Sequence, residues 1–552
     1  MSKGLRHRCL VVVAGCLLLA QPSMAAEAIT RNLVDVSWLE RHLDDPAVLI
    51  LDASPAPLHA AQHIRGAINV DAFVYGGREV PVAETERLYQ NWGVSPGKTI
   101  VLYDQGGTFM ATRLFFSLLY HGFPAKNLAI LDGGMSKWQE AGLPVTKDAT
   151  PAPKSGTFKV GKPNEDIRAR LPEVLTASGD PANHVLIDAL GADWHFGEVA
   201  PLPRPGHIPH GVLLPSTDLY RPDKTFKSPE ELRRMLSYLN IRPEQRIYTF
   251  CGGGVAASAP FFALRFLLGY PSVKLFVESE LGWLTDEREL PHWTYDAPFL
   301  MRDTRWLQWT GGQMLRTYIG APVSVVDVRP ADAFSQGHVP FALNIPADVF
   351  RSHVGSPAKL AEVLGAAGVD ASLEAVVVSG AGLTTDAALA FVMLEKLGQR
   401  KASVFMDSMD RWSQLGFKLT KDPTVVGTKK GPRDLAIEPK GYPASVRAGG
   451  VIADTKGAEG LYPKVFIASG KTMPASAHDG KVVHVPYTEL LNADGTPKAA
   501  KDIWNILAKA GVPRYGELVC VSDDPGEAAV NYFILKLMGF PDVKVLLGPA
   551  LR

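Results

Sequence analysis

Short apolar runs of four or five residues recur along this chain, and each is followed by a stretch with helical spacing of apolar positions. The pattern predicts β-strands buried on both faces that alternate with helices, as in parallel α/β sheets. One such strand is expected at each of residues 48–52, 185–188, 325–329 and 465–469. A second strand, which runs into a loop and a helix, is expected at each of residues 100–104, 247–251, 375–379 and 518–522.

The same order of features repeats four times, which indicates tandem copies of one unit. A histidine turn follows the first strand of each copy, at His63, His207, His338 and, more weakly, His478. The helix after the second strand stops at a glycine in every copy, as helix C-termini commonly do, and these glycines are Gly122, Gly269, Gly398 and Gly539. We therefore predict four α/β domains, each a mainly parallel sheet covered by helices on both faces, over residues 27–150, 160–300, 304–423 and 446–552.

Composition limits the classes of partner. The chain has 552 residues, of which 46% are hydrophobic and 21% are charged, as in ordinary globular domains. Lys plus Arg and Asp plus Glu each total 57, so the formal net charge is zero. Because no bulk charge attracts polyanions, we expect no nucleic-acid partner.

The N-terminus reads as a targeting segment. Basic residues precede an apolar run at 9–20, and small residues at 23–26 suit cleavage. We expect a signal peptide over residues 1–26 and a periplasmic location. A lipobox-like sequence ends at Cys16 and leaves a lipid anchor as an alternative, but the apolar run continues past Cys16, which favours ordinary cleavage. No other segment reaches 18 apolar residues, so no membrane span is expected.

Without that segment only Cys251 and Cys520 remain. Two cysteines so far apart do not make a disulfide framework, and no CxxC or HExxH spacing predicts a metal site. Cys520 lies inside a predicted strand, where a cysteine is usually a small buried hydrophobe. No metal or organic cofactor is expected.

Cys251 stands where a predicted strand ends, and the five residues after it carry little side chain: Gly252, Gly253, Gly254, Val255 and Ala256. Backbone N–H groups in such a loop can converge on the sulfur, and the next helix adds its positive end. We therefore expect a lowered pKa and a nucleophilic thiolate at Cys251. The other copies carry Asp104, Ser379 and Ser522 at this place, so only the second copy is predicted to be catalytic.

These features resemble tandem rhodanese-like sulfurtransferases of the thiosulfate and 3-mercaptopyruvate types. The resemblance rests on the strand, cysteine, loop and helix at Cys251, on the spacing from Asp188 to the turn at 206–209, and on residues 131–138. Members of the family pair a cysteine-free N-terminal domain with a catalytic C-terminal one, and the first two copies match that pair. The third and fourth copies are expected to be non-catalytic.

The resemblance implies that Cys251 takes a sulfane sulfur from a small donor, thiosulfate or 3-mercaptopyruvate, and passes it from a persulfide to cyanide or a thiol. The loop at 252–256 would bind the substrate. Family members also bind the donor anion through two upstream arginines. Arg204 keeps the second of these, and His195 is expected at the place of the first.

The loop composition leaves the donor open. Gly252 and Gly253 replace the basic residues that follow the cysteine in thiosulfate-preferring members. Gly253 and Ala256 also replace hydroxyl residues that mercaptopyruvate-type members carry. Neither donor class is therefore favoured by a full match.

Three other functions are compatible with parts of this pattern or are argued against by it. A Cys-x5-Arg phosphatase loop would need an arginine where the chain has Ala257, which argues strongly against phosphatase activity. A non-catalytic binding or scaffold protein, docking a partner through the third and fourth copies, stays open because three copies lack the cysteine. A persulfide carrier fed by a protein partner also stays open.

Several conspicuous polar residues are expected to be architectural rather than catalytic. Asp188 has counterparts in copies without cysteine, Asp52 and Asp327, so we expect it to stabilise the turn after the strand. His207 has similar counterparts in His63 and His338. Asp104 is expected to cap the helix that follows it.

Overall fold

The computed structural model describes residues 32–72, 80–431, 434–443, 450–452, 460–473 and 480–547. The predicted signal peptide at 1–26, with Cys16, and the weak turn at His478 lie outside the described residues. Over the described ranges, no helix combines the length and the apolar character that crossing a bilayer requires.

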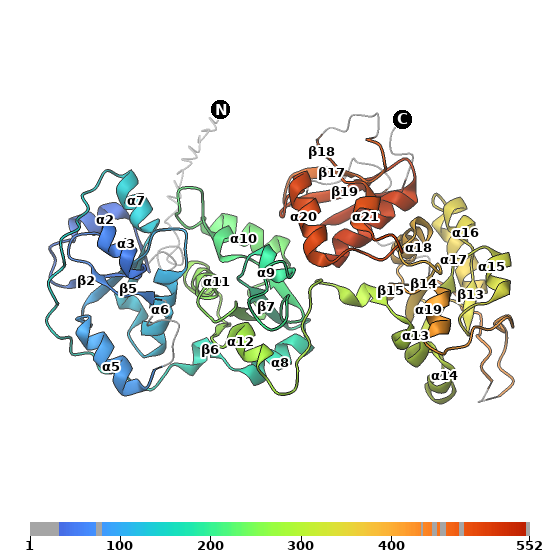
Figure 1. Ribbon diagram of the computed structural model, residues 1–552, viewed down its shortest axis with the longest axis horizontal. Helices are drawn as coiled ribbons and strands as arrows, with labels where there is room; N and C mark the ends of the chain where they lie inside the picture. The colour runs from blue at the N-terminus through green and yellow to red at the C-terminus, as the bar shows by residue number, and fades with distance from the viewer. Residues whose placement is uncertain are drawn as a thin grey trace, which may run out of the picture.

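The described residues fold into four five-stranded sheets with one common strand order. In each sheet the first strand lies at one edge beside the fifth, and the fourth, second and third follow. All strand pairs are parallel, as illustrated by β2 with β4 and β7 with β9. Helices lie on both faces of the sheets (Figure 1). The predicted α/β class is thus confirmed. We call the four sheets with their helices units one to four; the first strand of unit three, at Met301–Arg302, begins before the predicted start at residue 304.

The strands of units one and two are β1 (Leu33–Val34), β2 (Val48–Asp52), β3 (Ile68–Asn69), β4 (Thr99–Tyr103), β5 (Leu128–Leu131), β6 (Arg168–Ala169), β7 (His184–Asp188), β8 (Gly211–Leu213), β9 (Arg246–Phe250) and β10 (Val273–Phe276). Those of units three and four are β11 (Met301–Arg302), β12 (Val323–Asp327), β13 (Ala342–Asn344), β14 (Glu374–Val378), β15 (Lys401–Phe405), β16 (Val451–Ile452), β17 (Lys464–Ala468), β18 (Lys481–His484), β19 (Glu517–Val521) and β20 (Val543–Leu546).

The helices of units one and two are α2 (Val36–Arg41), α3 (Ala56–Ala61), α5 (Val82–Asn91), α6 (Met110–Tyr120), α7 (Gly134–Glu140), α8 (Leu171–Gly179), α9 (Ala192–His195), α10 (Pro229–Tyr238), α11 (Ser258–Phe262), continued by the π-helical turn η4 (Ala263–Leu267), and α12 (Ser279–Leu284). Those of units three and four are α13 (Thr304–Gly311), α14 (Gln313–Ile319), α15 (Ala331–Gln336), α16 (Ala347–Ser352), α17 (Pro357–Ala366), α18 (Thr385–Lys396), α19 (Met409–Gln414), α20 (Ala500–Ala510) and α21 (Pro525–Leu537). Short 3-10 turns are η1 (Ala125–Asn127), η2 (Glu165–Ile167), η3 (Ser216–Leu219), η5 (Pro298–Leu300) and η6 (Tyr487–Leu490).

The sheet order sets the place of Cys251. The central strands β7 and β9 are neighbours, and Asp188 at the end of β7 is in register with Phe250 at the end of β9. Cys251 follows directly, so the thiol and the carboxylate of Asp188 lie at the same carboxyl edge of the sheet. This edge is where α/β proteins commonly place their ligands.

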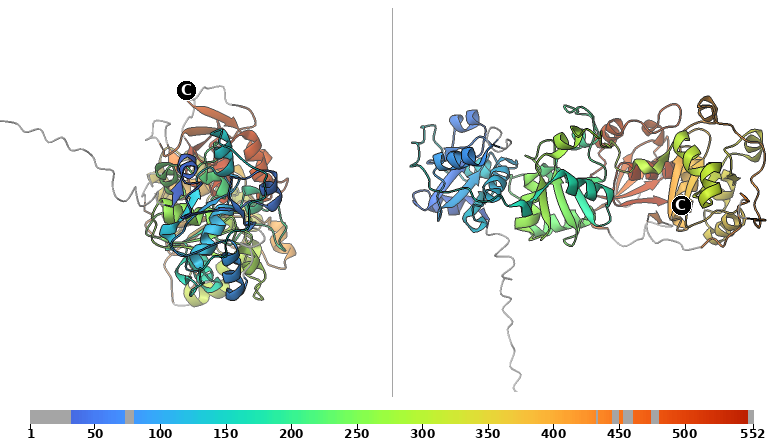
Figure 2. Two further views of the ribbon diagram at one scale, coloured as in Figure 1. Left: turned by 90° about the vertical axis from the view of Figure 1, so that its left-hand side faces the viewer. Right: turned by 90° about the horizontal axis from the view of Figure 1, so that it is seen from below.

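The units associate in pairs. One hydrophobic core runs through units one and two, where Phe115 of α6 and Phe262 of α11 meet edge to face with ring centroids 5.0 Å apart. A second core joins units three and four through α18 and α21, with Phe391 and Phe533 in the same arrangement at 5.0 Å. We call these pairs the first and second modules. Along the long axis of the molecule the units follow in the order one, two, four, three (Figures 1 and 2).

In each unit a loop follows the fourth strand of the sheet, which is β4, β9, β14 or β19. The other unit of the module covers this loop. We call these the entrance loops, at residues 104–109, 251–257, 379–384 and 522–524. In the first module the hydroxyl of Tyr220 donates to the carbonyl oxygen of Thr108. In the second module the N–H of Leu383 donates to the carbonyl oxygen of Gly495 at 2.9 Å, and Arg351 forms an ion pair with Asp524 at 3.0 Å.

Candidate active site around Cys251

Cys251 is the first residue after β9, and its thiol is buried. The residue is only 2% exposed, while Gly252 and Gly253 above it are partly exposed. The backbone N–H of Gly254 donates to Sγ of Cys251 at 3.1 Å. The sulfur thus lies beneath a loop of bare backbone, as the sequence predicted.

The electrostatic expectation for this thiol is wrong in direction. Burial raises the pKa of Cys251, and the negative charge of Asp188 adds to the rise. The N–H groups of Ala257, Gly253 and Gly254 lower the pKa but offset only part of the burial effect. The reason is that a desolvated thiolate loses more from leaving water than a few amide dipoles return. The resting group is therefore the thiol.

Gly254 determines the shape of the loop. Its φ of +78° lies in the left-handed region, and a methyl group on it would lie 2.3 Å from the carbonyl oxygen of Val277. A methyl group on Gly252 would meet nothing within 4 Å. Glycine is therefore required at position 254, where the chain turns to aim its N–H at sulfur.

The start of α12 supports the loop from below. Ser279 has a left-handed φ of +49°; its Oγ accepts from the N–H of Cys251 at 3.1 Å and donates to the carbonyl oxygen of Phe276 at 2.7 Å. The N–H of Leu281 donates to the carbonyl oxygen of Gly252 at 3.0 Å. The backbone on both sides of the thiol is thereby fixed.

Glu280 is an unexpected neighbour of the loop. Its N–H donates to the carbonyl oxygen of Cys251 at 3.0 Å, and its side chain is buried with Oε1 lacking a hydrogen-bond partner among the described residues. Burial, with the charge of Asp188, raises the pKa of Glu280 to about 9. Counted from the buried tryptophan of each unit, the corresponding residues of units one and three are Met135 and Met409. The acid is thus confined to the cysteine-containing unit among these three.

Unit one completes the surroundings of the loop. The hydroxyls of Thr112 and Ser258 share a hydrogen bond of 2.8 Å, and Ser258 also donates to the carbonyl oxygen of Phe109 at 3.3 Å. Arg113 donates to the carbonyl oxygen of Gly254 at 3.4 Å. Sequence reasoning missed these contacts because they come from the other unit. The available signal was the adjacent polar pair Thr112 and Arg113 in the mainly apolar helix α6.

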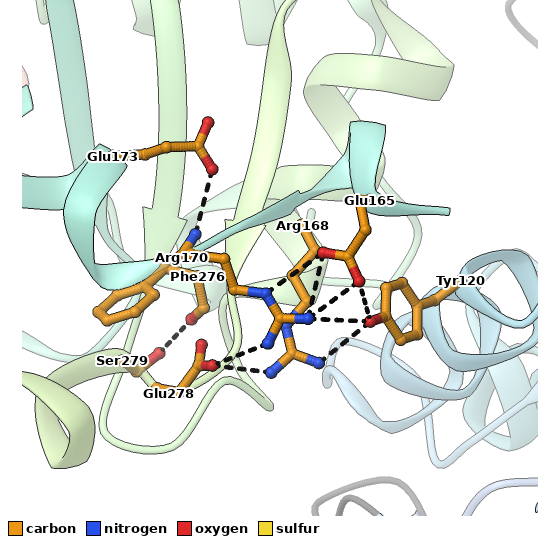
Figure 3. Close-up of polar contacts among 8 residues, drawn as sticks. All are labelled: Tyr120, Glu165, Arg168, Arg170, Glu173, Phe276, Glu278 and Ser279. Carbon is orange, nitrogen blue, oxygen red and sulfur yellow. Dashed lines mark hydrogen bonds and ion pairs between the residues drawn. The ribbon is translucent and has the colours of Figure 1, made fainter. Parts of the chain in front are cut away.

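A cavity of about 190 Å³ lies between units one and two, and Arg113, Arg168, Arg170 and Val277 are among its lining residues. Figure 3 shows how Arg168 and Arg170 are held. Arg168 and Arg170 both reach Glu278, at 2.8 and 3.3 Å, and Arg170 also pairs with Glu165 at 2.9 Å. Carboxylates thus balance these two arginines next to the turn that carries Ser279.

His195 does not have the environment of a donor-binding residue. It is fully buried, with Nδ1 2.8 Å from Asp188 Oδ2 and Nε2 2.6 Å from Asp296 Oδ1. Burial alone would lower the pKa of His195, but the charges and hydrogen bonds of Asp296 and Asp188 raise it to about 9. Because both ring nitrogens are engaged by carboxylates, the predicted contact of His195 with the substrate anion does not fit this arrangement.

The repeats explain this outcome. The ring of His195 stacks on that of His207 with centroids 3.6 Å apart. His59 and His63 stack in the same way at 3.9 Å in unit one, and Phe334 and His338 do so at 3.6 Å in unit three. The stacked ring therefore supports the turn in all three units, whether or not a cysteine is present.

Binding of the donor anion by Arg204, the second upstream candidate, stays a prediction. Arg204 is half-buried in the segment before His207. No hydrogen bond or ion pair links its guanidinium to the 251–257 loop in the part of the chain that the structure describes. Cys520 lies fully buried in β19, and burial raises its pKa, as expected of a cysteine that serves only as core.

Comparison with known proteins places the chain in a family. Residues 35–141 and 313–415 match the rhodanese-like domain. Sulfur carrier protein TtuD of Thermus thermophilus is 32% identical over 267 residues, which make up 46% of this chain and 93% of that protein. The chain belongs to the rhodanese-like sulfurtransferase family. A probable 3-mercaptopyruvate sulfurtransferase of Pseudomonas aeruginosa is 31% identical over 278 residues, 47% of this chain and 96% of that protein.

Among solved structures, this rhodanese-like protein is similar to SseA of Escherichia coli, described as a 3-mercaptopyruvate sulfotransferase. The identity is 29% and the TM-score 0.41, over 45% of this chain and 98% of that one. Each relative is matched nearly in full by about half of this chain. Sulfur transfer is the activity common to the family.

The three entrance loops without cysteine are occupied by structural hydrogen bonds. Asp104 accepts from the N–H groups of Met110 and Ala111 at 3.1 and 3.0 Å, so it caps the start of α6 as predicted. Ser379 donates to the carbonyl oxygen of Gly382 at 2.7 Å. Ser522 donates to Glu527 at 2.6 Å. In this rhodanese-like protein, Cys251 is therefore the candidate nucleophile among the four entrances.

The strand aspartates are architectural, as the repeats suggested. Asp188 accepts from the N–H of Leu190 at 3.0 Å, just as Asp52 accepts from Ser54 at 2.9 Å and Asp327 from Arg329 at 3.0 Å. These Asx-type turns redirect the chain after the strand.

Proposed function

We propose that this protein is an enzyme that transfers sulfane sulfur through a persulfide on Cys251. The observation that carries the proposal is the hydrogen bond from the N–H of Gly254 to Sγ at 3.1 Å, in the one entrance loop that has a cysteine. A backbone donor aimed at sulfur stabilises the negative charge that the thiolate and the persulfide both carry.

The reaction runs in two halves. The Cys251 thiol gives its proton to solvent, and the thiolate attacks the outer sulfur of the donor. An S–S bond forms at Cys251 while the donor's own bond to that sulfur breaks. Sulfite leaves with the electron pair if the donor is thiosulfate, or the enolate of pyruvate if it is 3-mercaptopyruvate. A cyanide or thiolate acceptor then attacks the terminal sulfur, and the Cys251 thiolate is regenerated.

The donor is proposed as a class, because the loop itself offers backbone rather than charge. Gly252 and Gly253 contribute no cation, and Arg113 reaches the loop only through the carbonyl oxygen of Gly254. A thiosulfate dianion would therefore gain little from this loop. The Pseudomonas relative is named a 3-mercaptopyruvate sulfurtransferase, which supports 3-mercaptopyruvate as the donor. Both donors belong in the test.

The test compares donors on purified mature protein. Thiosulfate, 3-mercaptopyruvate and glutathione persulfide are each incubated with the protein, intact mass reports added sulfur, and cyanide gives thiocyanate. Cys251→Ser is expected to abolish both readouts. Cys520→Ser is the matched control, because Cys520 is buried in β19, and it should keep full activity. Thiocyanate formation that survives Cys251→Ser would contradict the proposal.

A persulfide carrier loaded by another protein is the second candidate. The buried, protonated state of Cys251 favours it, since a partner could supply the base and open the loop. TtuD is itself named a sulfur carrier protein. Added sulfur on Cys251 from a protein persulfide, with none from the small donors, would favour this candidate. A scaffold role is favoured if neither source loads sulfur.

We also propose that the protein acts in the periplasm, on the strength of the signal-like segment at 1–26. N-terminal sequencing of the protein recovered from the periplasmic fraction tests this. A mature N-terminus at residue 27 is expected, whereas a lipid-modified Cys16 would show the alternative anchor.

A further inference from the structure

The helix α14 of unit three exposes its apolar side chains and buries its charged one. Surface helices of globular proteins usually do the reverse. Arg316 is buried, whereas Met314, Tyr318 and Ile319 are 50%, 82% and 69% exposed. Figure 1 shows this short helix at the lower edge of the molecule, next to α13. The apolar side chains of α14 therefore face solvent rather than the core of unit three.

Arg316 holds α14 in this orientation. Its Nε donates to the carbonyl oxygen of Gly311 at 2.7 Å, and a terminal nitrogen donates to the carbonyl oxygen of Val323 at 3.0 Å. The guanidinium also lies 4.7 Å from the ring centroid of Phe341. A rotation of the helix that buried its apolar face would break these hydrogen bonds and leave buried carbonyl groups unpaired. The exposed apolar face is thus a fixed feature of unit three.

Comparison with the other units shows that α14 is an addition to the common fold. In unit one, residues 42–47 join α2 to β2, and in unit two, residues 180–183 join α8 to β7. Neither of these described connections contains a helix. The sheet of a unit is therefore complete without α14, and packing within the unit does not account for its apolar residues.

Trp309, near the end of α13, extends the apolar surface and is 64% exposed. We call Trp309, Met314, Tyr318 and Ile319 the α14 patch. Met314 and Tyr318 lie one turn apart on the same face of the helix. Trp and Tyr are enriched where lipid headgroups meet acyl chains, and interfacial helices insert their apolar residues at this depth. The composition of the patch therefore fits the surface of a bilayer.

The charge around the patch fits the same partner. No acidic residue stands between Asp303 and Asp327, and the exposed Arg305 adds a positive charge. Membrane surfaces that contain anionic lipid attract basic side chains and repel acidic ones. The hydroxyl of Thr317, beside Tyr318, donates to the carbonyl oxygen of Gln313 at 2.8 Å. Removal of water from this hydroxyl therefore leaves no donor unpaired.

The size of the patch argues against a second copy of the chain as its partner. The four side chains together expose about 500–600 Å². A stable contact between two proteins buries about 800 Å² on each side. A bilayer needs no matching protein surface, because the apolar face of a helix enters the boundary between headgroups and acyl chains.

We propose that the α14 patch binds the surface of a phospholipid bilayer, with α14 lying in the plane of the interface and its apolar side chains inserted between the headgroups. An apolar patch of this size gives reversible attachment rather than a permanent anchor. Unit three lies at the end of the molecule farthest from unit one (Figures 1 and 2). Attachment therefore leaves the first module, with Cys251, free to meet its substrates.

The test is flotation of the purified mature protein with vesicles of phosphatidylethanolamine and phosphatidylglycerol. The wild-type protein is expected to float with the vesicles. Tyr318→Asp and Ile319→Asp should each weaken binding by about tenfold or more, because a charge replaces an apolar side chain that inserts. Leu58→Asp is the matched control, since Leu58 is an exposed apolar residue on α3 of unit one, and it should bind as the wild type does.

Tryptophan fluorescence locates the contact. Brominated lipid in the vesicles should quench part of the emission of the bound protein. Trp309→Phe keeps an apolar ring at this place, so the variant should still float but lose most of the quenching. Quenching that is unchanged in Trp309→Phe would show that another part of the chain meets the lipid.

Three results would overturn the proposal. The first is a wild-type protein that does not float, and the second is equal flotation of the wild type and Ile319→Asp. The third is a wild-type dimer in light scattering that Ile319→Asp converts to a monomer, because a second copy would then cover the patch. Circular dichroism confirms that each variant is folded. Ile319→Asp should transfer sulfur in solution as the wild type does, so this test and the test of Cys251 can fail independently.

Discussion

Gly254→Ala is the substitution that most directly tests how the loop acts on the thiol. The variant places a methyl group 2.3 Å from the carbonyl oxygen of Val277, at a φ of +78°. Because the obstacle is backbone rather than a flexible side chain, the loop must move to accommodate the methyl group. The movement turns the N–H of residue 254 away from Sγ, which it now approaches to 3.1 Å.

The size of the effect follows from two terms. The left-handed conformation costs alanine about 1–2 kcal/mol, which lowers the free energy of unfolding of unit two. A hydrogen bond to a charged acceptor contributes about 1.5–3 kcal/mol, and about 1.4 kcal/mol corresponds to one pKa unit. Its loss should therefore raise the pKa of Cys251 further and cut the thiolate fraction at neutral pH, about tenfold for each 1.4 kcal/mol lost.

The assay is the pH dependence of iodoacetamide alkylation, followed on the peptide that contains Cys251. Gly252→Ala is the matched control, because its methyl group meets nothing within 4 Å, and its stability should change by less than about 0.5 kcal/mol. Gly106→Ala places equal backbone strain in unit one, with a methyl group 2.1 Å from the carbonyl oxygen of Gly133. It should lower stability and leave the thiol pKa unchanged.

A role of the Gly254 N–H in stabilising the thiolate is refuted if Gly254→Ala shows the wild-type alkylation profile while its stability falls as much as that of Gly106→Ala. Position 254 would then be a packing site only, and the stabilisation of the thiolate would have to come from other donors of the loop.

Three further predictions concern the surroundings of the site. Ser279→Ala removes the acceptor of the Cys251 N–H and should lower the free energy of unfolding by about 1–3 kcal/mol. Ser279→Gly should lower it less, because glycine tolerates the φ of +49°. Urea denaturation measures both, and equal losses would show that the backbone at position 279 is not strained. Glu280→Met introduces the residue found at the corresponding position of units one and three. It should raise the free energy of unfolding by about 1–3 kcal/mol, because it removes a buried carboxyl group with an unpaired oxygen. A less stable variant would indicate that this oxygen has a partner. Burial raises the pKa of Asp132 from 3.8 to about 6, so the folded protein binds a proton more tightly than the unfolded chain. The free energy of unfolding should therefore fall as pH rises from 3.8 to 6, by up to about 3 kcal/mol. Asp132→Asn should remove this pH dependence, which thermal unfolding over the same pH range measures.

The repeat pattern was enough to predict the fold class, because every unit uses the same apolar strands and the same glycine after the helix. The capping role of Asp104 and the burial of Cys520 were also predictable, since each depends on residues close in sequence. The raised pKa of Cys251 was not, because amide dipoles can be counted from the loop whereas the loss of water depends on how unit one covers it.

His195 shows where the sequence held a usable signal. The residue lies seven positions after Asp188, as His59 does after Asp52 and Phe334 after Asp327. An aromatic ring at this spacing in three units points to stacking under the turn rather than to anion binding. Arg113 and Thr112 could not be assigned in this way, because contacts between units leave no regular spacing along the chain.

The mutual covering of entrance loops has a consequence for how such a chain can be rearranged. Each unit supplies part of the enclosure of its partner's loop, so the smallest exchangeable piece is the pair and not the single unit. Recombination between relatives should therefore preserve activity when the crossover falls at the boundary before β11, and lose it when it falls between units one and two. By the same logic, unit one contributes to the enclosure of Cys251 although it carries no nucleophile of its own at the entrance.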